Sequence, residues 1–332
     1  MASADRETQL PVTGPVTESD IPAERQSPDV PSSGGIDLIS SHVADVAGLS
    51  VRRALPRRSR RTVGAWCFLD HKGPVEVGHD QAVSIGPHPH MGLQTVTWLI
   101  TGEILHRDSL GSEQLIRPGQ LNLMTAGAGV SHAEATTGSY RGEVQGVQLW
   151  VAQPESTRHG SPAFEHHGVL PRHELAHGVA TVLVGTFGDI ASPARRDTDH
   201  VGVDLDLGVG VSLLPLAPDF EYGLVVLEGA VRIGPVGVEP GNLAYLGVGR
   251  HELALTAASP TRAILIGGLP FPEPLLMWWN FVGRTREEIT AAYQQWQAGD
   301  DRFGVVDSPL PRIPASPPAW LTTPLPPSAR RQ

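Results

Sequence analysis

Short runs of β-branched and other apolar residues, interrupted by glycine, proline or charge, recur through the middle of the chain. This pattern is typical of β-strands and predicts strands at residues 95–100, 145–151, 181–184 and 223–227. The 37 glycines and 30 prolines among 332 residues suit many short strands joined by turns better than long helices. We therefore expect an all-β fold.

One helix is expected, near the C-terminus. Thr285 and Glu288 have the spacing of a capping box. Four apolar residues then follow at helical spacing, namely Ile289, Ala292, Tyr293 and Trp296. The pattern predicts a short helix over residues 285–297 that serves packing rather than chemistry.

A weak internal repeat bears on the architecture. The sequence Leu-Ile-Thr-Gly at 99–102 is followed by Arg-Pro-Gly-Gln-Leu-Asn-Leu at 117–123, and Val-Leu-Glu-Gly at 226–229 is followed by Glu-Pro-Gly-Asn-Leu-Ala-Tyr at 239–245. In both copies a strand ends at a glycine, and a Pro-Gly turn later opens a new strand. Pro-Gly turns are common in β proteins, so chance is the alternative explanation. Two copies of one β-motif would imply two similar barrels in tandem.

Composition divides the chain into four parts. Residues 1–35 are polar, contain prolines and show no periodicity, which predicts a flexible tail. Residues 306–332 are rich in proline and predict an extended tail. Between the tails we expect a first barrel over 36–160 and a second barrel with the helix over 161–305.

Charge and composition exclude several classes of protein. The formal charge of −10 disfavours broad nucleic-acid binding, because phosphates would be repelled. The single cysteine excludes an internal disulfide and a cysteine-rich zinc site. The chain has no run of about 18 apolar residues that could span a membrane, and its polar start lacks the apolar core of a secretory signal. We expect a soluble, cytoplasmic protein.

Two pairs of residues have the spacing of metal ligands. His88 and His90 are separated by Pro89, so on a strand both imidazoles point to one face while the proline points away. His132 and Glu134 repeat the same spacing further along the chain. If the two strands lie side by side, three imidazoles and one carboxylate converge on one point.

Such a ligand set suits a first-row divalent transition metal. Imidazole favours iron, zinc, copper or nickel, and the carboxylate adds a hard oxygen ligand. In an octahedral ion, two positions stay open for a substrate oxygen and O2. A lone His-x-His is most often an ordinary pair of polar residues, but the later His-x-Glu in a glycine-rich context makes metal binding the better interpretation.

Longer stretches around these residues carry a resemblance. Cupin barrels bind metal through His-x-His and a later histidine on adjacent strands, and the chain is similar in particular to the pirin family. The similarity is dense over residues 50–155 and thin after 160. The stretches concerned are FLDHKGP (68–74), HPHMGLQTVT (88–97), HRDS (106–109), RPG (117–119), MTAGAGVSHAE (124–134) and RTREEI (284–289).

The resemblance implies two tandem cupin barrels of the double-stranded β-helix or jelly-roll type. It also implies one Fe(II) per chain in the N-terminal barrel, held by His88, His90, His132 and Glu134. The family includes quercetin 2,3-dioxygenases, so the leading expectation is an oxidoreductase that opens the ring of a flavonol or similar enol-bearing aromatic with O2. Glu134 would then be catalytic and take the proton of the substrate hydroxyl.

A second function stays open at this point. The family also includes proteins described as nuclear or transcriptional cofactors. The iron site could therefore belong to a non-catalytic redox-sensing or protein-interaction module that binds a protein partner. Both functions need the same four ligands, so the sequence does not separate them.

Some positions near the expected site depart from the family or add to it. The family usually has an acidic residue where this chain has Gln94, and an arginine where it has Met91. Neither position is a ligand in the pirin pattern, although Gln94 could alter the surroundings of the ligands. His106 and Asp108 share a strand face and could orient one of the metal ligands through a hydrogen bond, without binding the metal themselves. The alternative is a hydrogen bond that serves only the structure.

Other residues that could bind a ligand or react are better explained by a structural role. Six arginines over residues 52–61 could contact nucleic acid or an acidic partner, but a solvated loop in an acidic protein is the better explanation. Cys67 between two aromatic residues predicts a buried, inert thiol. His251 and Glu252 would face opposite ways on a strand, so we expect no metal in the second barrel. Five further histidines fit no metal pattern and suggest a solvated linker: His159, His166, His167, His173 and His177.

Overall fold

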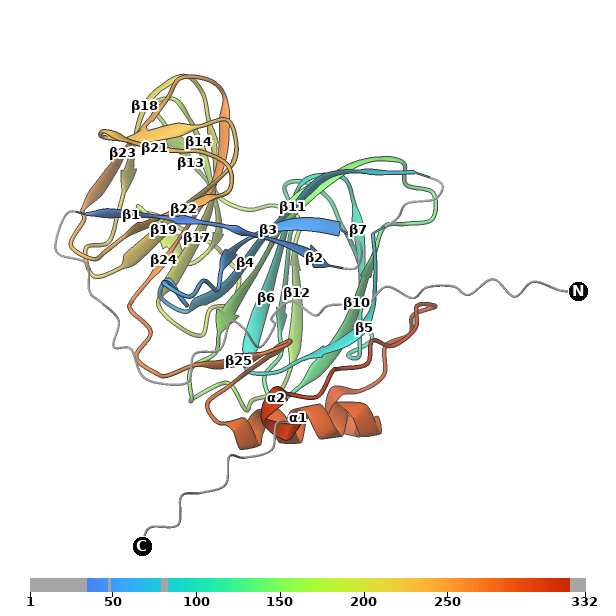
Figure 1. Cartoon of the computed structure of the whole chain (residues 1–332). Helices are drawn as coiled ribbons and strands as arrows, with labels where there is room; N and C mark the ends of the chain where they lie inside the picture. The colour runs from blue at the N-terminus through green and yellow to red at the C-terminus, as the bar shows by residue number, and fades with distance from the viewer. Residues whose placement is uncertain (1–34, 47–48, 79–82, 323–332) are drawn as a thin grey trace, which may run out of the picture.

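The structure is a computed structural model that describes residues 35–46, 49–78 and 83–322. The expected tail over residues 1–35 lies outside these ranges except for its last residue. The described chain forms two β-barrels, each built from one seven-stranded and one four-stranded sheet (Figure 1). Among the described residues, no helix is both long and apolar enough to cross a membrane.

The first barrel holds the His-x-His and His-x-Glu strands. Its seven-stranded sheet has the order β12-β9-β6-β11-β4-β3-β2. These strands are β2 (His42–Val46), β3 (Leu49–Leu55), β4 (Trp66–Val77), β6 (Leu93–Thr101), β9 (Leu121–Thr125), β11 (Gly142–Ala152) and β12 (Ala163–His167). The facing sheet has the order β5-β10-β7-β8 and consists of β5 (Ser84–His90), β7 (Ile104–Asp108), β8 (Glu113–Ile116) and β10 (Val130–Ala135).

The second barrel repeats this arrangement. Its seven-stranded sheet has the order β1-β22-β19-β24-β17-β14-β13 and consists of β1 (Ile36–Ser40), β13 (Arg172–Leu175), β14 (Gly178–Val184), β17 (His200–Leu207), β19 (Glu221–Glu228), β22 (Asn242–Leu246) and β24 (Thr261–Gly268). Its other sheet is β18 (Gly210–Pro215), β23 (Glu252–Ala257), β20 (Val231–Ile233) and β21 (Val236–Val238). A small ribbon joins β15 (Thr186–Phe187) to β16 (Ile190–Ala191). The four strands predicted from sequence lie inside β6, β11, β14 and β19, so these predictions are confirmed.

Strand β1 departs from the expected domain division. Residues 36–40 were expected in the first barrel, but β1 pairs antiparallel with β22 of the second barrel, with Ile36 opposite Leu246. The strand satisfies the free edge of β22, whose backbone groups would otherwise lack partners. The chain then enters the first barrel at β2, so it links the two barrels before either is complete.

The internal repeat corresponds to equivalent pairs of neighbouring strands in the two barrels. Strand β6 pairs with β9 in the first large sheet, and β19 pairs with β22 in the second. The strand-ending glycines Gly102 and Gly229 have φ of 89° and 73°, and the turn glycines Gly119 and Gly241 have φ of 83° and 89°. These left-handed conformations are costly for residues with a Cβ, which explains why glycine stands at each position.

The two large sheets pack against each other and form the core between the barrels. Apolar side chains from both sheets meet there, among them Trp98 and Leu149 from the first barrel and Ile264 from the second. The indole N–H of Trp66 donates to the carbonyl oxygen of Val201 across this interface at 3.1 Å. The second barrel has its own apolar core, formed by a separate cluster of buried residues.

After β24 the chain returns to the first barrel as a C-terminal arm, residues 276–322. The arm consists of β25 (Leu276–Trp278), β26 (Phe281–Gly283), α1 (Arg286–Ala298), the 3-10 turn η2 (Asp301–Phe303) and α2 (Ala319–Thr322). In Figure 1 its helices lie beneath the first barrel, beside the end of β5. The expected helix is α1: the Thr285 side chain caps it by accepting the Glu288 N–H at 3.2 Å. Ile289, Ala292 and Trp296 are buried, so the prediction of a packing helix is confirmed.

The described part of the proline-rich segment is not a free tail. Residues 306–322 were expected to extend away, but the Ile313 N–H donates to the Pro87 carbonyl oxygen at 2.9 Å and Ala315 is buried. Contact with β5 is so close that a Cβ on Gly86 would lie 2.1 Å from the Pro311 carbonyl oxygen. A chain rich in proline has few N–H groups to satisfy, so it can lie along the outside of a strand at little cost.

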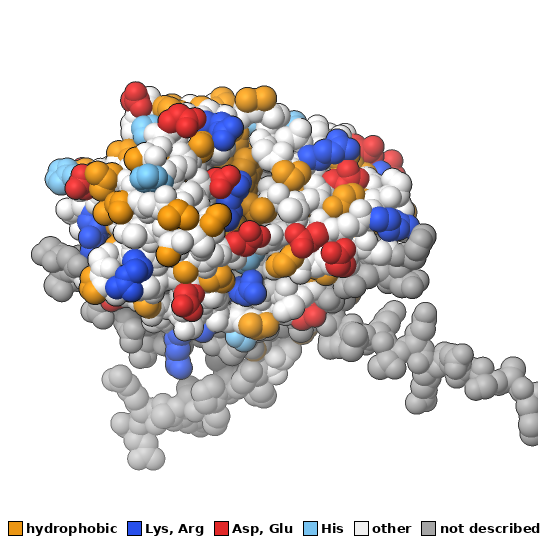
Figure 2. All heavy atoms as spheres, turned by 90° about the horizontal axis from the view of Figure 1, so that it is seen from above, with side chains coloured by type: hydrophobic (Ala, Val, Ile, Leu, Met, Phe, Trp, Pro, Cys, Tyr) orange, Lys and Arg blue, Asp and Glu red, His pale blue; other side chains and the backbone are white. Residues whose placement is uncertain are grey.

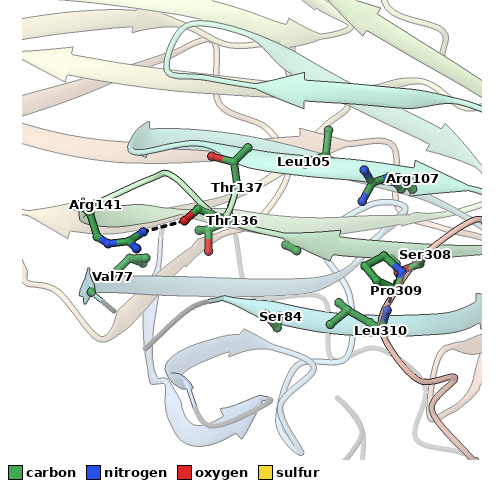
Figure 3. Close-up of a pocket in the computed structure, with 14 residues that line it drawn as sticks. Val77, Ser84, Leu105, Arg107, Thr136, Thr137, Arg141, Ser308, Pro309 and Leu310 are labelled. Atoms are coloured by element: carbon green, nitrogen blue, oxygen red, sulfur yellow. Dashed lines mark hydrogen bonds between the residues drawn. The ribbon is translucent and has the colours of Figure 1, made fainter. Parts of the chain in front are cut away.

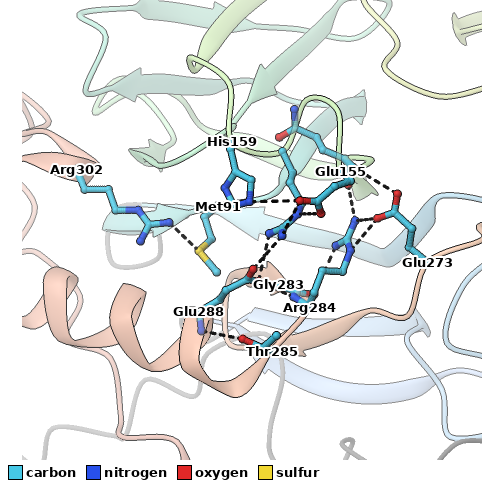
Figure 4. A network of polar contacts seen from close by, with 11 residues as sticks. Met91, Glu155, His159, Glu273, Gly283, Arg284, Thr285, Glu288 and Arg302 are labelled. Carbon is cyan, nitrogen blue, oxygen red and sulfur yellow. Dashed lines mark hydrogen bonds and ion pairs between the residues drawn. The ribbon is translucent and has the colours of Figure 1, made fainter.

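An ion pair and several hydrogen bonds tie the arm to the first barrel (Figure 4). Arg158, in the loop after β11, pairs with Glu288 of α1 at 2.8 Å. Arg284 donates to the Gln153 carbonyl oxygen at 2.8 Å, and the Arg302 guanidinium reaches the Met91 sulfur at 3.2 Å. These contacts fix the arm beside Met91, which directly follows His90.

Candidate metal centre

Strands β5 and β10 lie side by side and bring three histidines together. His132 on β10 is opposite His88 on β5, and His90 lies two residues further along the same face. The side chains are buried, and one ring nitrogen of each lies within 4.8 Å of the others, so this group could bind a metal ion. The convergence predicted from the two spacings is therefore observed for the three imidazoles.

The nitrogen positions fit a single ion. The Nε2 atoms of His90 and His132 are 3.0 Å apart. Two nitrogens that are each about 2.1 Å from one ion, at right angles, would also be about 3.0 Å apart. His88 uses Nδ1 to donate to the Gly86 carbonyl oxygen at 2.9 Å, which leaves the lone pair of its Nε2 free.

The protonation of the three histidines favours metal binding. Burial lowers the pKa of His88. Burial and the charge of a protonated His88 hold the pKa of His90 and of His132 well below the usual range. At neutral pH all three are therefore uncharged, which is the form that binds metals.

His106 and Asp108 lie directly behind His132. The two Nδ1 atoms of His132 and His106 are 3.3 Å apart, and His106 Nε2 donates to Asp108 Oδ2 at 3.1 Å. With Nε2–H donated to Asp108, His106 Nδ1 can accept a hydrogen bond from His132 Nδ1–H, which leaves the lone pair of His132 on Nε2. Asp108 is held by the N–H groups of Leu110 and Ser112, each at 2.9 Å. Burial raises the pKa of Asp108, but His106 and the Ser112 N–H outweigh it, so the pKa is lowered.

Glu134 lies beside this group rather than inside it. It forms a second cluster with His106 and His132 that could also hold a metal ion. A β-bulge between His132 and Glu134 shifts the register, and the carboxylate approaches Lys72 Nζ at 3.6 Å and the Thr97 hydroxyl at 3.4 Å. Burial raises the pKa of Glu134, but the Lys72 ammonium and the nearby imidazoles lower it by more. The pKa is therefore below its usual value, and the carboxylate stays ionised.

Gln94 was expected near the ligands, but it points away from them. It lies three residues from Thr97 on β6, so the two side chains occupy opposite faces of the strand. Thr97 faces Glu134, whereas the Gln94 amide donates to the Thr125 hydroxyl at 3.0 Å. Lys72 is the site residue that the sequence reasoning missed, although it is the chain's single lysine.

A cavity of about 420 Å³ lies on the other side of the metal-site sheet (Figure 3). Leu105, Arg107 and Ala133 line it, and they alternate along β7 and β10 with His106 and His132. Because neighbouring side chains on a strand face opposite ways, the sheet itself separates this cavity from the histidines. Residues 308–310 of the C-terminal arm close one side of the cavity.

Arginines of the run at residues 52–61 make structural contacts within the protein. Arg53 forms a buried, two-pronged pair with Asp70, with both distances 2.8 Å, and the Arg60 guanidinium stacks 3.6 Å above the Tyr245 ring. On the face seen in Figure 2, basic side chains lie among acidic and apolar ones and do not gather into one patch. Cys67 is buried, as predicted, and burial raises its pKa to about 12, which disfavours the reactive thiolate.

The prediction of a solvated histidine linker is wrong in part, because His166 and His167 lie on β12 of the first barrel and His173 lies on β13 of the second. His166 contacts the Asn122 side chain at 2.7 Å, and His167 pairs with Glu165 at 3.0 Å. His159 approaches Glu155, and His173 approaches Asp189. Within the described ranges, none of them belongs to a group of three metal-ligating side chains.

Comparison with known proteins decides the family. The family model "Pirin" matches residues 48–151, and "Pirin C-terminal cupin domain" matches residues 202–304. A Pseudomonas aeruginosa protein named "Putative quercetin 2,3-dioxygenase" is 45% identical over 86% of this chain and 91% of its own length. The chain belongs to the pirin family.

Solved structures agree with this membership and with the all-β fold of two cupin barrels. The crystal structure of a quercetin 2,3-dioxygenase from Acinetobacter baumannii superposes on this pirin with a TM-score of 0.82. It is 41% identical and covers 89% of this chain and 97% of its own. A bacterial pirin from Escherichia coli, solved in complex with nickel(II), has the same fold at 17% identity and a TM-score of 0.58, covering 71% of this chain and all of its own.

Proposed function

We propose that this pirin is a metal-dependent dioxygenase that opens the ring of a flavonol such as quercetin with O2. Its centre would be one Fe(II) in the first barrel, bound by His88, His90, His132 and Glu134. The observation that carries the proposal is the convergence of three buried, neutral imidazoles, with the Nε2 atoms of His90 and His132 at the separation expected around one ion. The names of the similar proteins from P. aeruginosa and A. baumannii support the choice of substrate.

The ligand charges favour an anionic substrate. Three neutral imidazoles and one carboxylate carry a charge of −1, which leaves Fe(II) with a net charge of +1. When bound, Fe(II) would supply a Lewis-acid site for the enolate oxygen and the redox chemistry with O2. Both atoms of O2 enter the products of a dioxygenase, so no external reductant is required.

Glu134 has the properties of the proton acceptor. Its carboxylate is buried and ionised because the Lys72 ammonium lies 3.6 Å away. It stands on the same strand as His132, close enough to act on a hydroxyl bound at the three histidines. The Thr97 hydroxyl at 3.4 Å would steady the carboxylate while it accepts the proton.

The test measures quercetin-dependent O2 uptake by protein loaded anaerobically with Fe(II). We expect uptake with the native protein and none with His90→Ala or Glu134→Ala. His251→Ala is the matched control, because His251 is an exposed histidine of the second barrel, and it should keep full activity. Undiminished turnover in folded His90→Ala or Glu134→Ala protein would refute the proposal.

A further inference from the structure

The single lysine of this chain stands beside the metal centre. The chain has 25 basic residues, of which only Lys72 is a lysine. It lies on β4, and its side chain is mostly buried, with 12% of its surface exposed. Its ammonium faces Glu134 at 3.6 Å, which is longer than a hydrogen bond, so this ion pair is loose.

A neighbouring ion pair, between Arg53 on β3 and Asp70 on β4, has a closed geometry. Arg53 and Asp70 are joined by two hydrogen bonds of 2.8 Å, which engage both carboxylate oxygens. Arginine's planar fork is suited to such closed pairs, whereas an ammonium is a compact charge with three rotatable donors. Lys72 therefore keeps donor capacity that the Glu134 carboxylate does not use.

A second unused donor lies in the same interior. Gln148 on β11 is 7% exposed, and its Oε1 accepts the Thr97 hydroxyl at 3.1 Å. Its Nε2 is buried and has no hydrogen-bond partner among the described residues. Leaving a buried donor unpaired costs about 1–3 kcal/mol, so such a group is often satisfied by a ligand or water. The Thr97 hydroxyl lies within reach of both Gln148 Oε1 and Glu134 Oε1 and can donate its one proton to either, so Gln148 lines the same interior as Glu134.

We propose that Lys72 and Gln148 form an oxygen-binding subsite next to the metal centre. The subsite binds the second oxygen of a substrate that carries an ionised enol hydroxyl beside a carbonyl group. The metal position would take one oxygen, and the Lys72 ammonium and Gln148 Nε2 would donate hydrogen bonds to the other. The inference rests on the proposed function only in placing a metal ion at the three histidines.

The simpler explanation is that Lys72 merely neutralises Glu134. That explanation requires only the ammonium, and it leaves the unpaired Gln148 donor without a role. It also predicts that loss of Lys72 affects the metal and every ligand alike. A subsite instead predicts that loss of either residue weakens only ligands that carry a second oxygen.

The test uses full-length protein loaded with Co(II), whose absorption reports ligand binding without turnover. The probe is maltolate, a small ionised enol beside a carbonyl, and imidazole serves as a neutral ligand with a single donor atom. We expect Lys72→Met to weaken maltolate binding about 10- to 100-fold, and Gln148→Met about 3- to 10-fold, with Co(II) content and imidazole affinity retained. Gln94→Met is the matched control, because Gln94 is an equally buried amide with an unpaired atom that faces away from the site.

Zn(II)-loaded protein gives an independent readout. Protein labelled with [ζ-15N]lysine has one side-chain signal, because lysine occurs once. Maltolate should shift this signal, and imidazole should not.

Three results would overturn the subsite: no maltolate binding by native protein, unchanged maltolate affinity in both variants, or equal losses for maltolate and imidazole. If Lys72→Met does not fold, Gln148→Met decides, since it removes no charge. Binding of maltolate that depends on Lys72 and Gln148, in a protein without quercetin-dependent O2 uptake, would support the subsite and refute the proposed dioxygenase.

Discussion

Replacing Asp108 by asparagine should weaken metal binding, although the His106 imidazole separates Asp108 from the three-histidine group. Asp108 Oδ1 accepts two backbone N–H groups, and Oδ2 accepts the proton of His106 Nε2. In Asp108→Asn, the backbone bonds would keep the amide oxygen at Oδ1, so the amide NH2 would face His106. His106 must then carry its proton on Nδ1 and donate it to His132 Nδ1. His132 in turn must carry its proton on Nε2, where the metal should bind.

The magnitude follows from the loss of an outer partner of a metal ligand. Such changes typically cost about 10- to 100-fold in metal affinity, which corresponds to about 1.4–2.7 kcal/mol. The 3.1 Å and 3.3 Å contacts leave no room for a water molecule to reverse the effect. We therefore expect a fall within this range rather than complete loss.

The assay is competition for Zn(II) or Co(II) between the protein and a chelator of known affinity. Asp204→Asn is the control, because Asp204 is a buried carboxylate paired with Arg262 in the second barrel. It can lower stability but should leave metal affinity unchanged. Native affinity in folded Asp108→Asn protein would refute the proposed role of His106 and Asp108 in setting the protonation of His132.

Three further predictions concern stability and reactivity. Thr285→Ala removes the cap of α1 and should lower the free energy of unfolding in urea by about 1 kcal/mol, whereas Thr285→Ser should lower it much less. Burial lowers the pKa of His200 to about 4, so protonation favours the unfolded state; metal-free protein should lose stability as the pH falls from 6.5 towards 4, and His200→Gln should flatten that slope. A slope unchanged in His200→Gln would contradict this. Cys67 should react with a thiol reagent only after unfolding, and rapid reaction of native protein would show that it is not buried.

Much of the site could be predicted because strands impose a period of two on side-chain direction. His88, His90 and His132 converge as that period requires, once β5 and β10 are neighbours. The repeat could be detected because each turn demands a glycine with positive φ, which leaves a mark in the sequence. The spacing of Thr285 and Glu288 likewise located α1 to within one residue.

The rest depended on features that local spacing does not record. The bulge after His132 turns Glu134 towards Lys72, and nothing in His-Ala-Glu indicates it. Gln94 lies near the ligands in sequence, but only the register of β6 shows that it faces Thr125. The pairing of β1 with β22 and the packing of residues 306–322 on β5 are long-range contacts, which composition alone cannot reveal.

The most direct test of the metal centre is the metal content of purified protein after anaerobic loading with Fe(II), compared between native protein and His90→Ala. The three buried imidazoles predict one iron per native chain and substantial loss of iron in the variant. Native protein that holds no stoichiometric metal after loading, or His90→Ala protein that holds as much as native, would contradict the existence of this centre.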